Sequence, residues 1–153
     1  MSSSSLAPDI RAWLASAHTA SLATLLEDPR ARGTPFATVV PFALETLDGG
    51  AAPWRLVLFM SELAVHTKNL RADARCSVLV AEPHTSDGPW RGWRVTLVGR
   101  MRLLEGADVA GALATFRARH PTAAQELPHD FSPWTLDVDA TRYIAGFGRM
   151  GWQ

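Results

Sequence analysis

The sequence is poor in several residue types, and each shortage excludes a class of protein. Cys76 is the single cysteine among 153 residues, which excludes an intrachain disulfide framework and a cysteine-rich zinc site. Lys68 is the single lysine, and basic and acidic residues balance at 15 each, so the formal net charge is zero. Without a net positive charge, we expect the chain to bind neither nucleic acid nor an anionic membrane.

Long hydrophobic runs are also absent. No window reaches the roughly 18 continuous apolar residues of a membrane-spanning helix, and residues 1–5 lack the basic and apolar regions of a signal peptide. We therefore expect a cytoplasmic protein, which agrees with the low cysteine content. Hydrophobic residues make up 47% of the chain, enough for one core, so residues 1–153 are expected to form a single domain.

The common catalytic signatures are missing as well. The chain contains no GxGxxG after a strand, no P-loop, no HExxH, no GxSxG and no paired CxxC. No catalytic acid, base or nucleophile is therefore assigned. His18, His84, His120 and His129 show no metal-ligand spacing with cysteine or acidic residues, and no metal site is expected.

The chain does contain clear periodic patterns. Ile10, Trp13, Leu14 and Ala17 recur at helical spacing after Pro8 and predict an N-terminal amphipathic helix. Six later runs with a period of two, separated by turn residues, predict strands at 20–26, 35–44, 54–60, 76–81, 93–103 and 134–139.

Two more helices are expected between these strands. One begins with Ser61 as N-cap and runs to about residue 72, and the other covers residues 109–120, before Pro121. Because strands and helices do not alternate regularly, the order favours an antiparallel β-barrel with peripheral helices (α+β) over a parallel doubly wound sheet.

The predicted strand 35–44 separates large from small side chains. Bulky residues share one face, and the other face carries small ones: Ala37, Val39, Pro41 and Ala43. The small face is suited to a flat ligand.

Residues 61–70, SELAVHTKNL, place hydroxyls, an imidazole, an amine and an amide at an expected strand-to-helix corner. Such a corner offers free backbone N–H groups and the positive end of a helix dipole, which suit a phosphate monoester. An ordinary capped surface helix has the same spacing, so the pattern alone leaves both interpretations open.

Five segments in order carry a family resemblance: 20–25; 33–35 with 39–42; 61–70 with 72–79; 94–99; and 143–149. Together they resemble the FMN-binding split-barrel superfamily of pyridoxamine-5′-phosphate-oxidase-like proteins, especially its haem-utilisation-like branch. The resemblance spans nearly the whole chain. It implies a six-stranded antiparallel Greek-key split barrel that forms a homodimer, with two FMN sites at the subunit interface.

The resemblance also implies cofactor contacts. For the flavin ring, they come from the second predicted strand and the end of the third: Thr38, Val39, Val40, Pro41, Met60 and Ser61. For the ribityl phosphate, it implies His66, Thr67 and Lys68. Val65 and His66 stand where the oxidase has an arginine-lysine pair, so phosphate binding through the histidine would depend on pH.

Two arginines complete the implied site. Arg94 stands where the oxidase has a glutamine that reaches flavin across the dimer interface, and its guanidinium there would stabilise the negative charge of reduced flavin. Alternatively, Arg94 belongs to a charged, exposed strand face with Arg100 and Arg102. The segment 146–149 is expected to close over the site, with Arg149 as a contact.

Three functions stay open. The first is an FMN-binding flavoprotein, an FMN-dependent oxidoreductase of unknown substrate and electron partners. Pyridoxamine-phosphate oxidase activity itself is not expected, because residues 148–153 lack the arginine-rich substrate segment of that enzyme. The second is haem binding, with His66 or His129 as axial ligand. The third is a cofactor-free barrel that binds a small molecule or protein as a dimer.

Overall fold

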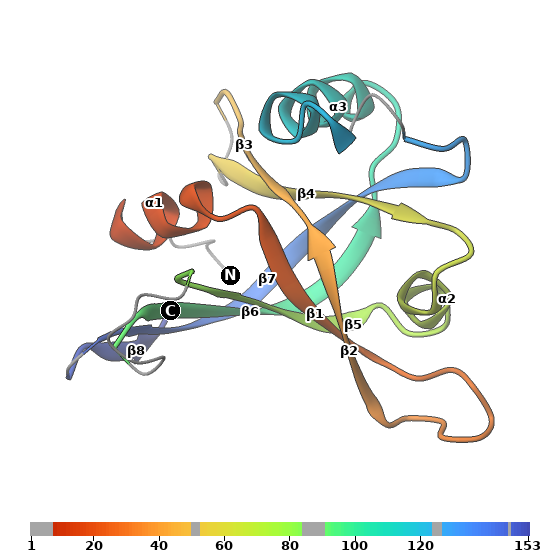
Figure 1. Cartoon of the computed structure of the whole chain (residues 1–153), viewed down its shortest axis with the longest axis horizontal. Coiled ribbons are helices and arrows are strands. Elements are labelled where there is room, and N and C mark those ends of the chain that lie inside the picture. The colour runs from red at the N-terminus through yellow and green to blue at the C-terminus, as the bar shows by residue number, and fades with distance from the viewer. Residues whose placement is uncertain (1–7, 50–52, 84–90, 124–126, 147) are drawn as a thin grey trace.

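The computed structural model describes residues 8–49, 53–83, 91–123, 127–146 and 148–153 (Figure 1). Its helices are α1 (Pro8–Ser16), α2 (Val65–Ala72) and α3 (Asp108–Arg119). Its strands are β1 (Thr19–Leu25), β2 (Pro35–Pro41), β3 (Ala43–Thr46), β4 (Trp54–Ser61), β5 (Arg75–Ala81), β6 (Trp93–Leu103), β7 (Phe131–Ala145) and β8 (Met150–Trp152). All strand pairings in the described part of the chain are antiparallel. The prediction of a barrel-type antiparallel sheet with peripheral helices is therefore confirmed.

The strand order is β2-β1-β5-β6-β7-β4-β3, and β8 pairs with β7. The two ends of this path, β2 and β3, are consecutive in the chain and are separated only by Phe42. The Phe42 N–H donates to the His18 carbonyl (3.2 Å), and the Phe42 carbonyl accepts from His120 Nε2 (2.7 Å). The single strand predicted at 35–44 is therefore wrong at Phe42, where the chain leaves β1 and joins β4.

The later strands agree with the sequence in part. The strand 93–103 has the predicted bounds, but β7 begins before and ends after the predicted 134–139, and β8 was not expected. A register shift in the β6–β7 ladder lies between Val98 and Gly99. A Cβ at Gly99 would lie 2.0 Å from the Asp137 carbonyl oxygen. The close approach of β7 to β6 at this irregularity therefore requires glycine.

Two buried clusters lie on opposite sides of the sheet. The interior cluster includes Ile10 and Leu14 of α1, which confirms the predicted amphipathic helix. The second cluster lies on the outer side of β3 and β4, where α3 packs over them (Figure 1). Its members come from both sides of that contact: Ala43, Val57, Phe59, Leu104, Ala112 and Phe116. The predicted helix over 109–120 is thus confirmed and is needed to cover one part of the barrel.

The outer side of β2, β1, β5 and β6 has no such cover among the described residues. Cross-strand register places eight uncharged residues there in two rows: Val39, Ser21, Leu79 and Thr96; and Ala37, Ala23, Ser77 and Val98. We call these eight residues the bare face. Val39, Leu79 and Val98 expose 71%, 39% and 37% of their surfaces.

The three helices of the described residues, α1, α2 and α3, have 9, 8 and 12 residues. Within the described ranges, none of the three is long and apolar enough to cross a bilayer.

Candidate functional site

The candidate site lies at the corner between β4 and α2, residues 61–69. β4 ends at Ser61, and α2 begins at Val65 with Ala64 in the N-cap position, where no side chain caps the helix. Ser61 was predicted as the N-cap, and this is wrong. Its Oγ instead accepts a hydrogen bond from the Leu63 N–H (3.1 Å), in a turn that precedes the helix. The predicted end of the helix at residue 72 is confirmed.

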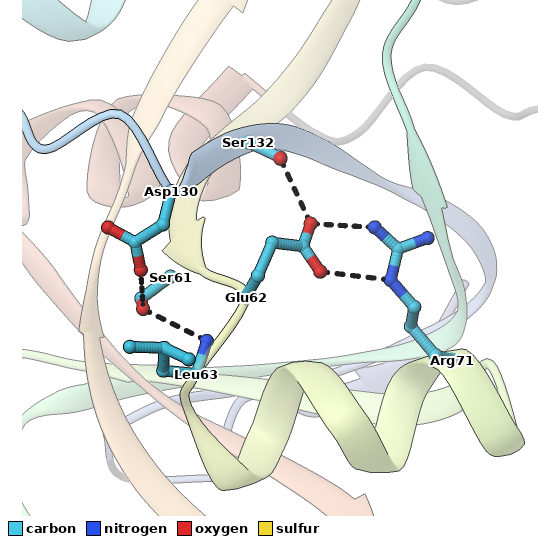
Figure 2. A network of polar contacts seen from close by, with 6 residues as sticks. All are labelled: Ser61, Glu62, Leu63, Arg71, Asp130 and Ser132. Atoms are coloured by element: carbon cyan, nitrogen blue, oxygen red, sulfur yellow. Dashed lines mark hydrogen bonds and ion pairs between the residues drawn. The ribbon is translucent and has the colours of Figure 1, made fainter.

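A polar network ties this corner to the loop before β7 (Figure 2). The Ser61 hydroxyl donates a short hydrogen bond to the Asp130 carboxylate. The Glu62 N–H donates to the Asp130 carbonyl (2.9 Å). Both bonds hold the end of β4 against the segment that also carries His129. Asp130 was not singled out in the sequence, because it lies 69 positions after Ser61 and no pattern joins the two.

Glu62 joins α2 to the same strands. Its carboxylate accepts two hydrogen bonds from Arg71 (3.0 and 2.6 Å) and one from the Ser132 hydroxyl (3.0 Å), as Figure 2 shows. The Arg71 guanidinium, followed by the Ser132 hydroxyl, lowers the pKa of Glu62 against the opposing effect of burial. Arg71 also lies 5.4 Å from the ring centroid of Trp134, within cation–π range. This network therefore fixes the outer side of α2.

His66 faces the opposite side, toward β2. Its Nδ1 lies 3.1 Å from the Thr38 Oγ1. The imidazole is half-buried, and burial lowers its pKa below the ordinary 6.5. Burial therefore favours the uncharged imidazole, and one of its ring nitrogens is engaged by Thr38.

The three residues expected to surround a phosphate point in different directions. Consecutive helix residues are about 100° apart, so the three side chains cannot share one direction. His66 faces β2. Thr67 is fully buried, and its hydroxyl has no partner among the described residues. Lys68 is exposed and lines a shallow cavity of about 340 Å³. The other residues of that cavity come from the end of β1 and from the Glu62 network: Glu27, Glu62, Arg71 and Ala72. Thr67 is therefore placed in the core, and Lys68 is not beside His66.

The implied ring contacts on β2 alternate between the two sides. Val39 and Pro41 are exposed, Thr38 is half-buried, and Val40 is buried. Ala37, Val39 and Pro41 of the expected small face are thus exposed, whereas Ala43, beyond the break at Phe42, is buried in the cluster under α3. Met60 is 2% exposed and belongs to the interior cluster, so its side chain points away from the surface.

The two arginines lie elsewhere on the subunit. Arg94 projects from the outer side of β6 opposite Ala81 and Ile144, three strands away from β2, or about 14 Å at the usual strand spacing. Arg149 precedes β8 and approaches Asp9 of α1 at 3.4 Å. One subunit therefore does not bring Arg94 or Arg149 to the corner. Phe147 of the glycine-rich segment lies outside the described residues.

Asn69 supplies the amide counted among the polar groups of residues 61–70, but the sequence indicated no specific contact for it. It is 1% exposed, and its side chain bonds to the end of β1. A polar residue inside a short helix pattern was the available signal, since a buried amide requires partners.

Comparison with known proteins identifies the family. The family model described as the CREG β-barrel matches residues 5–152, nearly the whole chain. The chain belongs to the CREG β-barrel family. This confirms the expected split barrel of the pyridoxamine-5′-phosphate-oxidase-like superfamily.

Two relatives of this CREG β-barrel protein have names that refer to haem. It is 35% identical over 115 residues to the non-canonical heme oxygenase HOZ, chloroplastic, of Arabidopsis thaliana, covering 74% of this chain and 33% of that protein. It is 33% identical to a heme binding protein from Mycobacterium smegmatis, with a TM-score of 0.79 and coverage of 94% and 55%. The chain thus spans about one third and about half of their lengths.

A third likeness extends to the fold alone. The structure of HutZ, described as a haem storage protein from Vibrio cholerae, superposes with a TM-score of 0.68 at 20% identity. The superposition covers 97% of this chain and 94% of HutZ. The CREG β-barrel of this chain is therefore a fold that also occurs in a protein of similar length.

Proposed function

We propose that this chain binds haem and that His66 ligates the iron. The observation that carries the proposal is the hydrogen bond between His66 and Thr38 (3.1 Å) at a half-buried imidazole. With Nδ1–H donating to the Thr38 hydroxyl, Nε2 keeps its lone pair for a metal. Histidine ligands in proteins usually have their second ring nitrogen held in this way.

The surroundings of His66 fit the flat, apolar body of a porphyrin. Val39 follows Thr38 and is 71% exposed, and Val65 precedes His66 and is 46% exposed. Val65 therefore places an exposed apolar side chain next to the imidazole on α2, whereas Val39 lies on the other side of β2 from Thr38 and belongs to the bare face. Large exposed apolar residues that cluster beside a poised polar group are typical of a ligand site.

The relatives support the same choice of cofactor. The names of HOZ and of the mycobacterial protein, at 35% and 33% identity, refer to haem. When bound, haem would supply a redox-active iron. The residues of this chain would hold it: His66 as ligand, Thr38 as the group that orients the imidazole, and Val65 as an apolar contact.

A spectroscopic titration tests this function. Haemin added to the wild-type protein is expected to give a shifted Soret band that saturates at one haem per subunit. The variant His66→Ala is expected to lose at least tenfold in affinity, whereas His129→Ala, which removes an exposed histidine of the neighbouring loop, serves as the matched control. Loss in His129→Ala alone would assign the iron to His129 instead.

FMN is the second candidate, and the small exposed face of β2 favours it. Ala37, Val39 and Pro41 leave room along this strand for a flat ring, and Lys68 is an exposed cation that a phosphate could reach. In this case Lys68→Ala would weaken FMN much more than riboflavin. Equal losses of the two ligands would place the phosphate elsewhere, and no spectral change with haem or FMN would favour a cofactor-free binding protein.

We also propose that the protein is a homodimer joined through the bare face. Its eight residues carry no charge, and Val39, Leu79 and Val98 expose apolar surface on β2, β5 and β6. The centres of protein interfaces are depleted in charge in the same way. Arg94 borders this face on β6, so a second subunit facing it would bring its Arg94 toward β2 of the first.

The expected fold has six strands, and the structure agrees with this number when β2 and β3 are counted as one strand bent at Phe42. This strand pairs with β1 before Phe42 and with β4 after it. Together with β1, β4, β5, β6 and β7 it makes six strands, with β8 as an addition to β7. We propose that the six-stranded Greek-key description applies in this sense.

A further inference from the structure

Asn69 connects α2 to the end of β1 through both ends of its amide. Its Oδ1 accepts a hydrogen bond from the Glu27 N–H (3.0 Å), and its Nδ2 donates to the Thr24 Oγ1 (3.0 Å). Asn69 and Thr24 are each 1% exposed. Glu27 lies beyond the last residue of β1, so its N–H has no ladder partner and relies on the amide.

The chemistry of this contact calls for an amide. One end of the side chain must accept from an N–H, and the other end must donate to a hydroxyl. The Thr24 hydroxyl in turn donates to the Phe36 carbonyl of the paired strand at 3.5 Å. Aspartate has no donor for the Thr24 oxygen and would bury a charge. Leucine has neither group and would leave the buried Thr24 hydroxyl and the Glu27 N–H without this partner.

Asn69 and His66 attach the same helix to the same hairpin. They are three residues apart on α2, which is about 4.5 Å along the axis and about one turn, so they lie on one side of it. His66 bonds to Thr38 of β2, and Asn69 bonds to Thr24, whose cross-strand partner is Phe36 of β2. Phe36 and Thr38 are about 7 Å apart along the strand. The helix is therefore held at two points, and neither its rotation nor its distance from β2 is free.

We propose that Asn69 is a positioning residue that holds α2 where the imidazole of His66 meets the hydroxyl of Thr38. The His66–Thr38 bond is partly exposed to solvent and joins two short side chains, so a small rotation of α2 breaks it. The Asn69 bonds are buried and prevent this rotation. The effect of Asn69 on the affinity for haem rests on the proposed function. Its effect on the position of His66 does not.

The first test uses the protein without any cofactor. Two-bond ¹H–¹⁵N NMR correlations of the His66 ring report its tautomer at a fixed pH of 8. Wild type is expected to show one tautomer, with the proton on Nδ1. Asn69→Ala is expected to show a mixture of both tautomers, because the ring loses the fixed approach of Thr38.

Two control variants separate positioning from general destabilisation. Val57→Ala removes a fully buried side chain from the cluster under α3, and it is expected to lower the melting temperature while the His66 tautomer stays as in wild type. Thr24→Ser keeps the hydroxyl that Asn69 contacts and is expected to keep the wild-type tautomer. If Asn69→Ala does not fold, Thr24→Val removes one of the two bonds and is expected to give an intermediate mixture.

The second test measures the consequence for the cofactor. Asn69→Ala is expected to bind haemin about tenfold or more weakly than wild type, the usual effect of losing a group that orients a ligating histidine. An unchanged tautomer in folded Asn69→Ala, or an equal change in Val57→Ala, would overturn the positioning role. A wild-type protein that binds no haemin, with the tautomer change still present, would overturn the haem function and leave the role of Asn69 intact.

Discussion

The outer surface of the barrel has two parts that differ in what covers them. Over β3 and β4, the chain supplies its own cover, and Phe116 of α3 packs at 5.0 Å between ring centroids from Phe59, at 1% exposure. Over β2, β1, β5 and β6, the bare face has no cover from the described residues, and Val39 remains 71% exposed. Both parts consist of antiparallel strands, but one is buried under a helix of the same chain and the other is exposed.

Polarity does not explain which part of the outer surface is covered, because the covered part contains charged residues and the bare face does not. Under α3, Glu45 is 8% exposed and pairs with Arg55 at 2.5 Å, and Arg55 also contacts Asp108 of the helix at 3.2 Å. The bare face carries no charge among its eight residues, although it is the accessible part. An exposed surface with apolar residues and no charge is typical of a protein interface, so the bare face is suited to binding another molecule.

The largest expected effect is on the part that the chain covers itself. Phe116→Ala should lower the free energy of unfolding by about 3–5 kcal/mol, because it leaves a cavity in a closed cluster. Val39→Ala on the bare face should change the same quantity by less than about 0.5 kcal/mol in dilute, monomeric protein. Urea denaturation of both variants measures the contrast, and comparable losses would mean that Val39 is already buried in the single subunit.

The next effect concerns association. Leu79→Asp places a charge in the centre of the bare face and should weaken the proposed dimer at least a hundredfold, about 2.7 kcal/mol. Leu63→Asp, at a position that is 75% exposed at the β4–α2 corner, should leave the dimer unchanged. Sedimentation or light scattering over a range of concentrations measures both. A wild-type protein that stays monomeric at all concentrations would contradict the proposal that a second subunit covers the bare face.

Most of the fold could be predicted from the sequence, because alternation reports which side of a strand is buried. The pattern around Val95 and Leu97 predicted the bounds of β6, and the stripe ending at Phe116 predicted α3. The break at Phe42 could not be predicted, because the residue is apolar and fits the alternation. It depends on contacts with His18 and His120, which are distant in sequence.

For the candidate site, the sequence predicted a polar corner between a strand and a helix but not the directions of its side chains. Residues 61–70 were singled out because their residue types suit a ligand, and the structure places them together at a corner. The directions of Thr67 and Lys68 could not be predicted, because they depend on where α2 begins. The bonds of Asp130 to the corner and of Asn69 to Thr24 join segments that carry no common motif.

A third prediction concerns the ion pair under α3. A Cβ at Gly111 would lie 2.6 Å from the Glu45 Oε1, so Gly111→Ala must shift the Glu45 carboxylate, whose Oε2 pairs with Arg55. Alanine is favoured over glycine in a helix by about 1 kcal/mol, and disturbing a buried pair costs more, so a net loss of about 1–2 kcal/mol is expected. In a Glu45→Ala background the displaced group is gone, and Gly111→Ala should become stabilising. A loss in both backgrounds would mean that Glu45 is not the reason for the glycine.

The smallest effect concerns the contact that joins the two parts. Glu62 follows β4, which lies under α3, and it binds Arg71 of α2, which is anchored on the hairpin of the bare face. The pKa of Glu62 is lowered from its ordinary 4.5, chiefly by Arg71. Its stabilisation is therefore fully present above about pH 4.5 and is lost as the pH falls through the folded-state pKa.

The partners in this contact are 34% and 48% exposed, so screening limits the contribution of the pair to less than about 1 kcal/mol. Glu62→Gln should be less stable than wild type by this amount at pH 7, and the difference should shrink toward zero as the pH is lowered below 4.5. Urea denaturation at pH 7 and pH 3.5 measures it. A difference as large at pH 3.5 as at pH 7 would show that the charge of Glu62 is not the source of the stabilisation, and the Ser132 hydroxyl would not account for it either, because the amide oxygen of glutamine accepts the same hydrogen bond.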